Sequence, residues 1–141
     1  MRKIIFIVTF GIIAFACEDN MTTVSETVVT TSTVAGSWQV SKYIDDNDDE
    51  TISFNNITFV IEPDGGFVVE KNGGEIATGT WQLKDRNTEI EFNVPAFANE
   101  NESLGEDLYE IHDDWNIILA SETQLHLQDE DERFELQKVI E

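Results

Sequence analysis

The sequence of 141 residues contains one cysteine and two histidines, too few for most catalytic and metal-binding arrangements. A single cysteine excludes any disulfide within the chain. The Gly-x-Ser-x-Gly pattern of hydrolases and the His-Glu-x-x-His pattern of metalloproteases are also missing. We therefore predict that the protein is not an enzyme and uses no cofactor.

Basic side chains are also scarce. Eight lysine and arginine residues stand against 29 aspartate and glutamate residues, which gives a formal net charge of −21. Nucleic acid and anionic membrane surfaces repel such a chain, so we exclude nucleic acid as a partner. The charge predicts a solvated acidic surface that attracts cations diffusely, without a defined metal site. We attribute the adjacent His112, Asp113 and Asp114 to chance in so acidic a chain.

The acidic segment DDNDDE, residues 45–50, superficially resembles a calcium-binding loop. Asp45, Asn47 and Asp49 have the alternating order of calcium ligands. However, Glu50 stands where that loop needs glycine, and Asn56 stands where it needs a bidentate glutamate. We interpret this segment as the loop of a β-hairpin.

The one long apolar run lies at the start of the chain, at residues 4–15, directly after Arg2 and Lys3. As a helix it would reach only about 18 Å, against about 30 Å for the hydrocarbon core of a membrane. The run ends in the small residues Ala14 and Ala16, and acidic residues follow Cys17. This order is typical of a secretion signal, so we predict that residues 1–16 are removed.

Two signal peptidases fit this cleavage site, and an uncleaved anchor is a third alternative. Ordinary secretion would leave a free N-terminal cysteine. The sequence around Ala16 and Cys17 resembles a bacterial lipobox, which implies that the Cys17 thiol carries a diacylglyceryl group and becomes an acylated N-terminus. At about 0.8 kcal/mol per buried CH₂, two or three acyl chains would hold the protein firmly to a membrane.

Three segments are expected: a signal peptide at 1–16, a lipidated N-terminus and tether at 17–35, and one domain at 36–141. The tether is rich in Thr and Ser. Its acidic start resembles export signals that carry lipoproteins to the bacterial surface, so we expect the outer membrane or cell surface; inner-membrane retention is the alternative. Cleavage would leave six basic and 29 acidic side chains, a net charge of −23.

The domain shows apolar residues with period two, and helix signals are nearly absent. This alternation predicts antiparallel strands with one buried face. Asn55 and Asn56 suggest a bulge, and the segment 95–114 predicts a long loop with a short helical turn at 104–111. The expected strands are 37–44, 57–63 preceded by 52–54, 66–71, 75–84, 88–94, 115–120, 124–129 and 133–139.

Eight strands in up-and-down order predict an all-β fold, a small closed antiparallel barrel without free edges. The first strand begins Gly36-Ser37-Trp38, and Gly79-Thr80-Trp81 repeats the pattern. In each triplet glycine and tryptophan share one face, so the indole can close a barrel end while glycine allows close backbone approach. Residues 36–141 thus resemble the lipocalin-like domain of bacterial lipoproteins. The resemblance also implies a basic side chain against Trp38, from Arg133 or Lys138.

Two functions remain open for such a domain. The resemblance implies a barrel that binds a small apolar ligand. The alternative is a structural or protein-interaction module, acting on neighbouring envelope proteins, whose barrel is filled by its own side chains. The number of large inward-facing candidates favours a filled barrel, and they are Phe54, Phe59, Phe67, Trp81, Phe92, Trp115 and Phe134.

Overall fold

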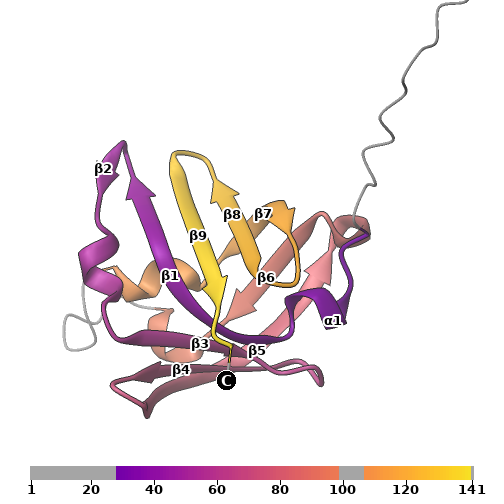
Figure 1. Ribbon diagram of the computed structural model, residues 1–141, viewed down its shortest axis with the longest axis horizontal. Helices are drawn as coiled ribbons and strands as arrows, with labels where there is room; N and C mark the ends of the chain where they lie inside the picture. Colours follow the sequence, from indigo (N-terminus) through magenta and orange to yellow (C-terminus); the bar gives the residue numbers. More distant parts are fainter. Residues whose placement is uncertain (1–27, 99–106, 141) are drawn as a thin grey trace, which may run out of the picture.

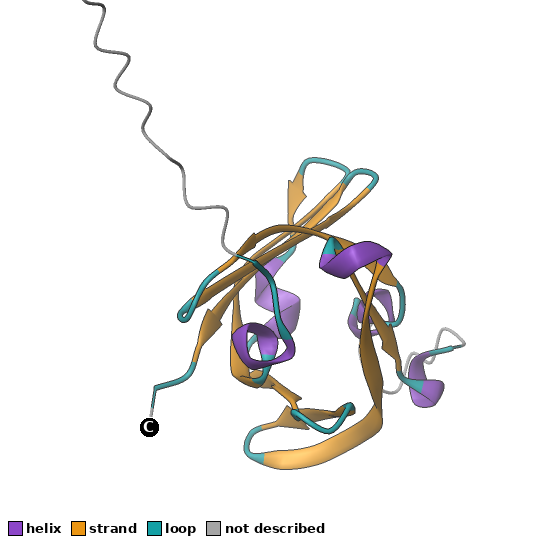
Figure 2. Cartoon of the chain, turned by 90° about the vertical axis from the view of Figure 1, so that its right-hand side faces the viewer, coloured by secondary structure: helices purple, strands orange, loops and turns teal. Residues whose placement is uncertain are grey.

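The computed structural model describes residues 28–98 and 107–140, and these form an antiparallel β-barrel (Figure 1). Eight strands pair in chain order, and β1 pairs with β9, which lies beside it in Figure 1, to close the ring. Figure 2 shows the strands arranged around this ring. The short β2 (Asp48–Asp49) folds back on the end of β1. The predicted all-β, eight-stranded barrel is therefore confirmed. The barrel strands are β1 (Gly36–Asp45), β3 (Ile57–Ile61), β4 (Gly66–Lys71), β5 (Gly74–Lys84), β6 (Glu89–Asn93), β7 (Asp114–Ala120), β8 (Gln124–Asp129) and β9 (Glu132–Lys138).

The period-two pattern explains most of the core. In β3, Ile57, Phe59 and Ile61 are buried and the residues between them are partly exposed. In β6, Ile90 and Phe92 alternate in the same way with glutamates. One face of each strand therefore packs inside the barrel and the other meets solvent. Within the described residues, none of the helices combines the length and apolar character needed to cross a membrane.

Strand β1 carries an irregularity that the sequence did not reveal. Its register with β9 shifts between Val40 and Lys42, which marks a β-bulge. The extra residue reverses the alternation, so that Trp38 and Tyr43 are both fully buried although they lie five positions apart. Tyr43, which we did not predict as a core residue, thereby enters the barrel.

The expected strand at 52–54 is wrong. Residues Thr51–Phe54 form a 3₁₀ helix, η1, and Asn56 turns the chain with a φ of 63°. The Thr51 side chain explains the turn, because its Oγ1 accepts a hydrogen bond from the Tyr43 N–H at 2.9 Å and donates one to Asp49 Oδ1 at 2.6 Å. Phe54 consequently packs into the core from a helix.

The connection between β6 and β7 contains two 3₁₀ helices, η3 (Pro95–Phe97) and η4 (Leu108–Ile111). The helical turn that we predicted at 104–111 is therefore confirmed at Leu108–Ile111. Residues 104–106 lie outside the described residues. Phe97, Leu108 and Ile111 are buried. Both helices therefore add apolar side chains to the core.

The folded domain begins before Gly36, contrary to the predicted tether at 17–35. Thr31–Val34 form the short helix α1, which Thr30 caps through its side chain. Val34 is fully buried, and its carbonyl accepts a hydrogen bond of 2.8 Å from Trp38 Nε1. Because this bond and this burial tie the segment to the barrel, residues 28–35 belong to the domain. The predicted signal peptide and Cys17 lie outside the described residues.

Candidate functional site

The two ends of the barrel differ in the side chains that close them. We call one the Trp38 end, where β1 starts and β9 finishes beside α1. We call the other the Tyr43 end, where η1, η4 and the β8–β9 turn meet. The strand registers place these elements at opposite ends, because β1 runs from Gly36 at the first to Asp45 at the second.

The predicted motif residues of the first strand lie at the Trp38 end. Besides the Trp38 hydrogen bond to Val34, the Lys138 ammonium lies over the Trp38 ring, 5.0 Å from its centroid. Lys138, and not Arg133, therefore provides the basic side chain that we expected there. Gly36 has a φ of 142°, a backbone conformation that residues with a side chain rarely adopt, and a Cβ there would displace the flexible end of Lys138.

Gly79 and Trp81 occupy corresponding places on β5. A Cβ on Gly79 would collide with the backbone of Asn93 and Val94 on the neighbouring strand. Trp81 Nε1 donates a hydrogen bond of 2.7 Å to the Glu62 carbonyl oxygen. The second triplet therefore brings β5 and β6 into close contact and fixes the turn before β4.

Aromatic side chains fill much of the barrel interior. Phe134 stands at the centre of the group: its ring centroid lies 4.3 Å from that of Tyr43, 5.0 Å from Phe54 and 4.9 Å from Trp115. A second group continues along the barrel, because Phe67 lies 5.8 Å from Phe59 and 4.6 Å from Phe92. All seven of the predicted large inward-facing side chains are buried.

Acidic side chains gather at the Tyr43 end. Burial and the adjacent carboxyl of Glu110 raise the pKa of Glu132 to about 8, and Asp45 adds to the effect. The Glu110 carboxyl lies within hydrogen-bonding reach of Glu132. Asp107 similarly raises the pKa of Glu50. We call Asp45, Glu50, Asp107, Glu110 and Glu132 the acidic cluster; all five are partly exposed.

Tyr43 lies beneath the acidic cluster. Its ring is fully buried, and its hydroxyl makes no hydrogen bond of normal geometry although it approaches Glu132 closely enough to lower that pKa slightly. Burial, with Glu132 and Glu110 as further causes, raises the pKa of Tyr43 far above its usual value. The hydroxyl therefore stays protonated and can donate. Trp115 Nε1 at the same end is also buried without a partner.

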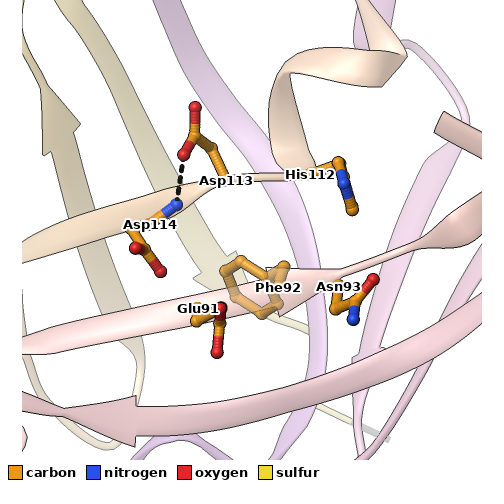
Figure 3. A pocket seen from close by; sticks show the side chains of 6 residues that line it. All are labelled: Glu91, Phe92, Asn93, His112, Asp113 and Asp114. Atoms are coloured by element: carbon orange, nitrogen blue, oxygen red, sulfur yellow. Dashed lines mark hydrogen bonds between the residues drawn. The ribbon is translucent and has the colours of Figure 1, made fainter. Parts of the chain in front are cut away.

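A pocket of about 270 Å³ lies on the outer wall where β6 and β7 separate (Figure 3). The two strands pair only over residues 89–91 and 114–116. Beyond that point His112 Nδ1 accepts a hydrogen bond of 2.8 Å from the Val94 N–H. The imidazole therefore takes the place of the backbone carbonyl that a paired strand would offer. The pocket is lined by Glu91, Phe92, Asn93, His112, Asp113 and Asp114.

Several polar groups around this pocket are paired within the chain, although Asp114 Oδ1 is buried without a hydrogen-bond partner. Lys84 lies 2.8 Å from Asp114 and 3.8 Å from Glu91. In Figure 3, Asp113 points away from Glu91 and accepts a hydrogen bond of 2.7 Å from the Asp114 N–H. Because His112 Nδ1 already accepts a backbone hydrogen bond, we attribute a structural role to this pocket. The acidic cluster is the better candidate site.

Residues 45–50 form a hairpin, as we predicted. Asp46 and Asn47 turn the chain with φ values of 47° and 72°, and β2 pairs with the end of β1. Within residues 28–98 and 107–140, no group of three or more histidine, cysteine or acidic side chains is arranged to hold a metal ion. The sequence signal for the acidic cluster was weak, because its members come from three separate segments, the hairpin at 45–50, the region of η4 and the start of β9.

Comparison with known proteins shows which fold this is. No protein-family model and no curated protein matches the sequence. Three solved structures do match. One is a lipocalin-like protein from Bacteroides uniformis, with a TM-score of 0.57 and 21% identity over 74% of this chain and 97% of that chain.

The fold is lipocalin-like. A second match, an uncharacterized protein from Bacteroides eggerthii, has a TM-score of 0.58 and 18% identity over 74% of this chain and 98% of that one. A third, a protein of the DUF4847 family from Bacteroides vulgatus, has a TM-score of 0.54 and 12% identity over 74% and 93%. At these identities the likeness extends to the fold alone.

Proposed function

We propose that the protein is a lipid-anchored, non-catalytic binding module of the bacterial cell envelope, at the outer membrane or cell surface. The anchor rests on the resemblance of residues 1–17 to a lipoprotein signal. The binding role rests on the lipocalin-like fold, which presents loops at two ends of a rigid barrel. Its proposed partners are a membrane, through the lipid, and a neighbouring envelope protein or a small ligand.

The observation that carries the choice of binding mode is the packing of the interior. Rings from β1, β3, β4, β6, β7, β9 and η1 contact one another at centroid distances of 4.3 to 6.4 Å. Close-packed rings leave little room for a large apolar guest. The packing therefore favours a barrel that binds through its ends.

An enclosed small ligand is the second candidate. It is favoured by Trp115 Nε1, a donor that is buried without an acceptor. Buried polar groups are almost always hydrogen-bonded, so an unpartnered one suggests an acceptor brought from outside the chain.

The anchor is tested by expressing the full chain and its Cys17→Ser variant in a bacterium. We expect the wild-type protein to carry acyl mass and to sediment with membranes, and the variant to lose both. Sedimentation that is unchanged in the variant would overturn the lipidation. The two binding modes are separated by extracting the purified protein with organic solvent: a stoichiometric apolar molecule supports the enclosed ligand, and none across several preparations supports binding through the ends.

A further inference from the structure

Exposed apolar side chains are concentrated at the Trp38 end. The large apolar side chains that are exposed among the described residues are Val28, Ile52, Ile118, Leu119, Val139 and Ile140. Of these, only Ile52 lies at the Tyr43 end, in η1. Single exposed apolar residues scattered over a surface are ordinary, whereas a concentration in one region is typical of a surface that contacts a partner or a membrane.

Hydrogen bonds of the turn between β5 and β6 connect Val28 to the end of β7. Asn87 Nδ2 donates a hydrogen bond of 2.9 Å to the carbonyl oxygen of Val29. The carbonyl oxygen of the next residue, Thr88, accepts a hydrogen bond of 2.8 Å from the Ile117 N–H. Val28 therefore lies on the same side of the barrel as the end of β7.

The end of β9 lies beside the turn that follows β7. The Lys138 N–H donates a hydrogen bond of 2.9 Å to the Thr123 carbonyl oxygen in this turn, and the Val139 N–H donates one of 2.8 Å to the Ser37 carbonyl oxygen. The last described residues therefore also lie at the Trp38 end. We call the following five residues the apolar rim: Val28, Ile118, Leu119, Val139 and Ile140.

A β-bulge in β7 places two side chains of the apolar rim on the outer surface next to each other. The register of β7 with β8 shifts between Ile117 and Leu119. Because Trp115 is buried, strict alternation would turn Leu119 inward. The extra residue instead leaves Ile118 and Leu119 exposed, by 60% and 39%, and buries Ala120. The bulge therefore keeps in water an apolar surface that contact with another apolar surface would remove from it.

The two ends also differ in charge. The acidic runs at 45–50 and 129–132 lie at the Tyr43 end, in the β1–β2 hairpin and the β8–β9 turn. Figure 1 shows β2 and the β8–β9 turn at the top, and α1 and the end of β9 lower down. At the Trp38 end the acidic residues stand singly, and Arg86, in an exposed turn, makes no ion pair with any described residue. A guanidinium in that place suits the phosphate groups of lipids.

We propose that the apolar rim rests on the surface of the lipid bilayer to which Cys17 is attached. The inference rests on the proposed lipid anchor and adds the orientation of the barrel. Val28, within the rim, follows Cys17 by eleven positions. Even at full extension these residues reach no more than about 40 Å, so the anchor holds the rim near the bilayer. A weak affinity for lipid then suffices, because the second contact is made within one tethered molecule.

A lipid surface fits the apolar rim better than a second copy of the chain. Each copy carries a formal net charge of −21, so two copies repel each other. On a bilayer the rim side chains enter the headgroup region and the Arg86 guanidinium meets phosphate groups. The acidic cluster at the Tyr43 end then faces away from the membrane, where partners in solution can reach it.

The test places one fluorophore on the lipidated full chain in phosphatidylcholine vesicles. Lipidation converts the Cys17 thiol to a thioether, so a cysteine introduced by Leu119→Cys is the one free thiol and takes an environment-sensitive label. Ile52→Cys is the matched control, because Ile52 is an exposed apolar residue at the opposite end. We expect a blue-shifted emission at position 119, and quenching by spin-labelled lipid about threefold or more stronger than at position 52, as for a label within the headgroup region.

Two further substitutions show whether the apolar side chains cause the contact. Ile118→Asp together with Ile140→Asp, in the Leu119→Cys chain, should lower the quenching to the level at position 52. Both side chains are exposed, so the core stays intact, and circular dichroism verifies the fold. Unchanged quenching in this variant would contradict the role of the rim.

The outcomes separate this inference from the proposed anchor. Equal quenching at positions 119 and 52 in a protein that carries acyl mass would overturn the contact and leave the anchor intact. A blue shift at position 119 that grows with protein density and is not quenched by lipid would overturn the contact in favour of a second copy. A protein without acyl mass that leaves the vesicles would overturn the anchor and the contact together.

Discussion

The Trp38 end and the Tyr43 end use similar side chains to opposite effect. At the first, the indoles of Trp38 and Trp81 donate hydrogen bonds to carbonyl oxygens and Lys138 lies over a ring. At the second, Trp115 Nε1 is buried without a partner, and the Tyr43 hydroxyl has only a contact with Glu132 that is not a hydrogen bond of normal geometry, beneath carboxyls that raise the pKa of Glu132. The contrast teaches that one end is built for stability, and that the other keeps unsatisfied groups of the kind found at functional sites.

The stabilising role of the Trp38 end is tested most strongly by Trp38→Ala. Loss of a fully buried indole, its hydrogen bond to Val34 and its contact with Lys138 should reduce the free energy of unfolding by about 3–5 kcal/mol. Urea denaturation followed by circular dichroism measures the change. A loss below about 1 kcal/mol would show that the Trp38 end does not stabilise the barrel.

Gly79→Ala probes the same end through the backbone. The added methyl group would strike the Asn93 carbonyl and the Val94 backbone, which cannot move as a flexible side chain can. We expect a loss of about 1–3 kcal/mol, typical of overpacking. The matched control is Gly74→Ala, where the nearest atom to an added Cβ is a carbonyl oxygen at 3.7 Å, an ordinary contact. Equal effects at both glycines would contradict the close-approach argument.

At the Tyr43 end the effect should appear as a dependence on pH. The pKa of Glu132 is raised from 4.5 to about 8 in the folded protein, so the folded state binds more protons than the unfolded state between these values. The free energy of unfolding should therefore fall as pH rises through this range. Because the carboxyl is partly exposed, solvent screening limits the fall to about 1–2 kcal/mol.

The Glu132→Gln variant isolates this contribution. In this variant the free energy of unfolding should depend less on pH, and the variant should be more stable than the wild type at pH 8.5. Thermal unfolding across the pH range measures both effects. Glu122→Gln, at the other end of the barrel, should leave the profile unchanged. If the stability of the wild type rose with pH over the same range, the raised pKa of Glu132 in the folded protein would be contradicted.

The smallest expected effect is that of Tyr43→Phe. Its ring packing stays, and only a hydroxyl without a normal hydrogen bond is removed, so stability should change by no more than about 1 kcal/mol in either direction. Trp38→Phe is the counterpart at the other end, because it leaves the buried Val34 carbonyl without its donor and should cost about 1–3 kcal/mol. If the two variants lost similar amounts of stability, the proposed difference between the Trp38 end and the Tyr43 end would be contradicted.

Much of the fold could be predicted from the sequence because alternating side chains have a direct physical meaning. Ile90 and Phe92, between glutamates, can pack only on one face of a strand. The β-bulge before Lys42 could not be predicted in this way, since it depends on pairing with β9, far along the chain. The burial of Tyr43 was missed for that reason.

The candidate site was predicted less well than the fold. Glu110 and Glu132 are ordinary acidic residues in an acidic sequence, and only the meeting of η4 with β9 makes them neighbours. The helix α1 was missed because its four residues carry no amphipathic period; what holds it is the Trp38 indole. Contacts between distant segments, and not local preference, decided each of these features.

The pairing of β1 with β9 also has a consequence for the order of events during biogenesis. The seam joins residues nearly a hundred positions apart, as in the Ser41 hydroxyl bond to the Glu135 carbonyl. The ring therefore cannot close until the last strand has been synthesised, and folding that depends on such distant contacts is slow. The strand that is synthesised last is therefore also the one that completes the hydrogen bonding of the first.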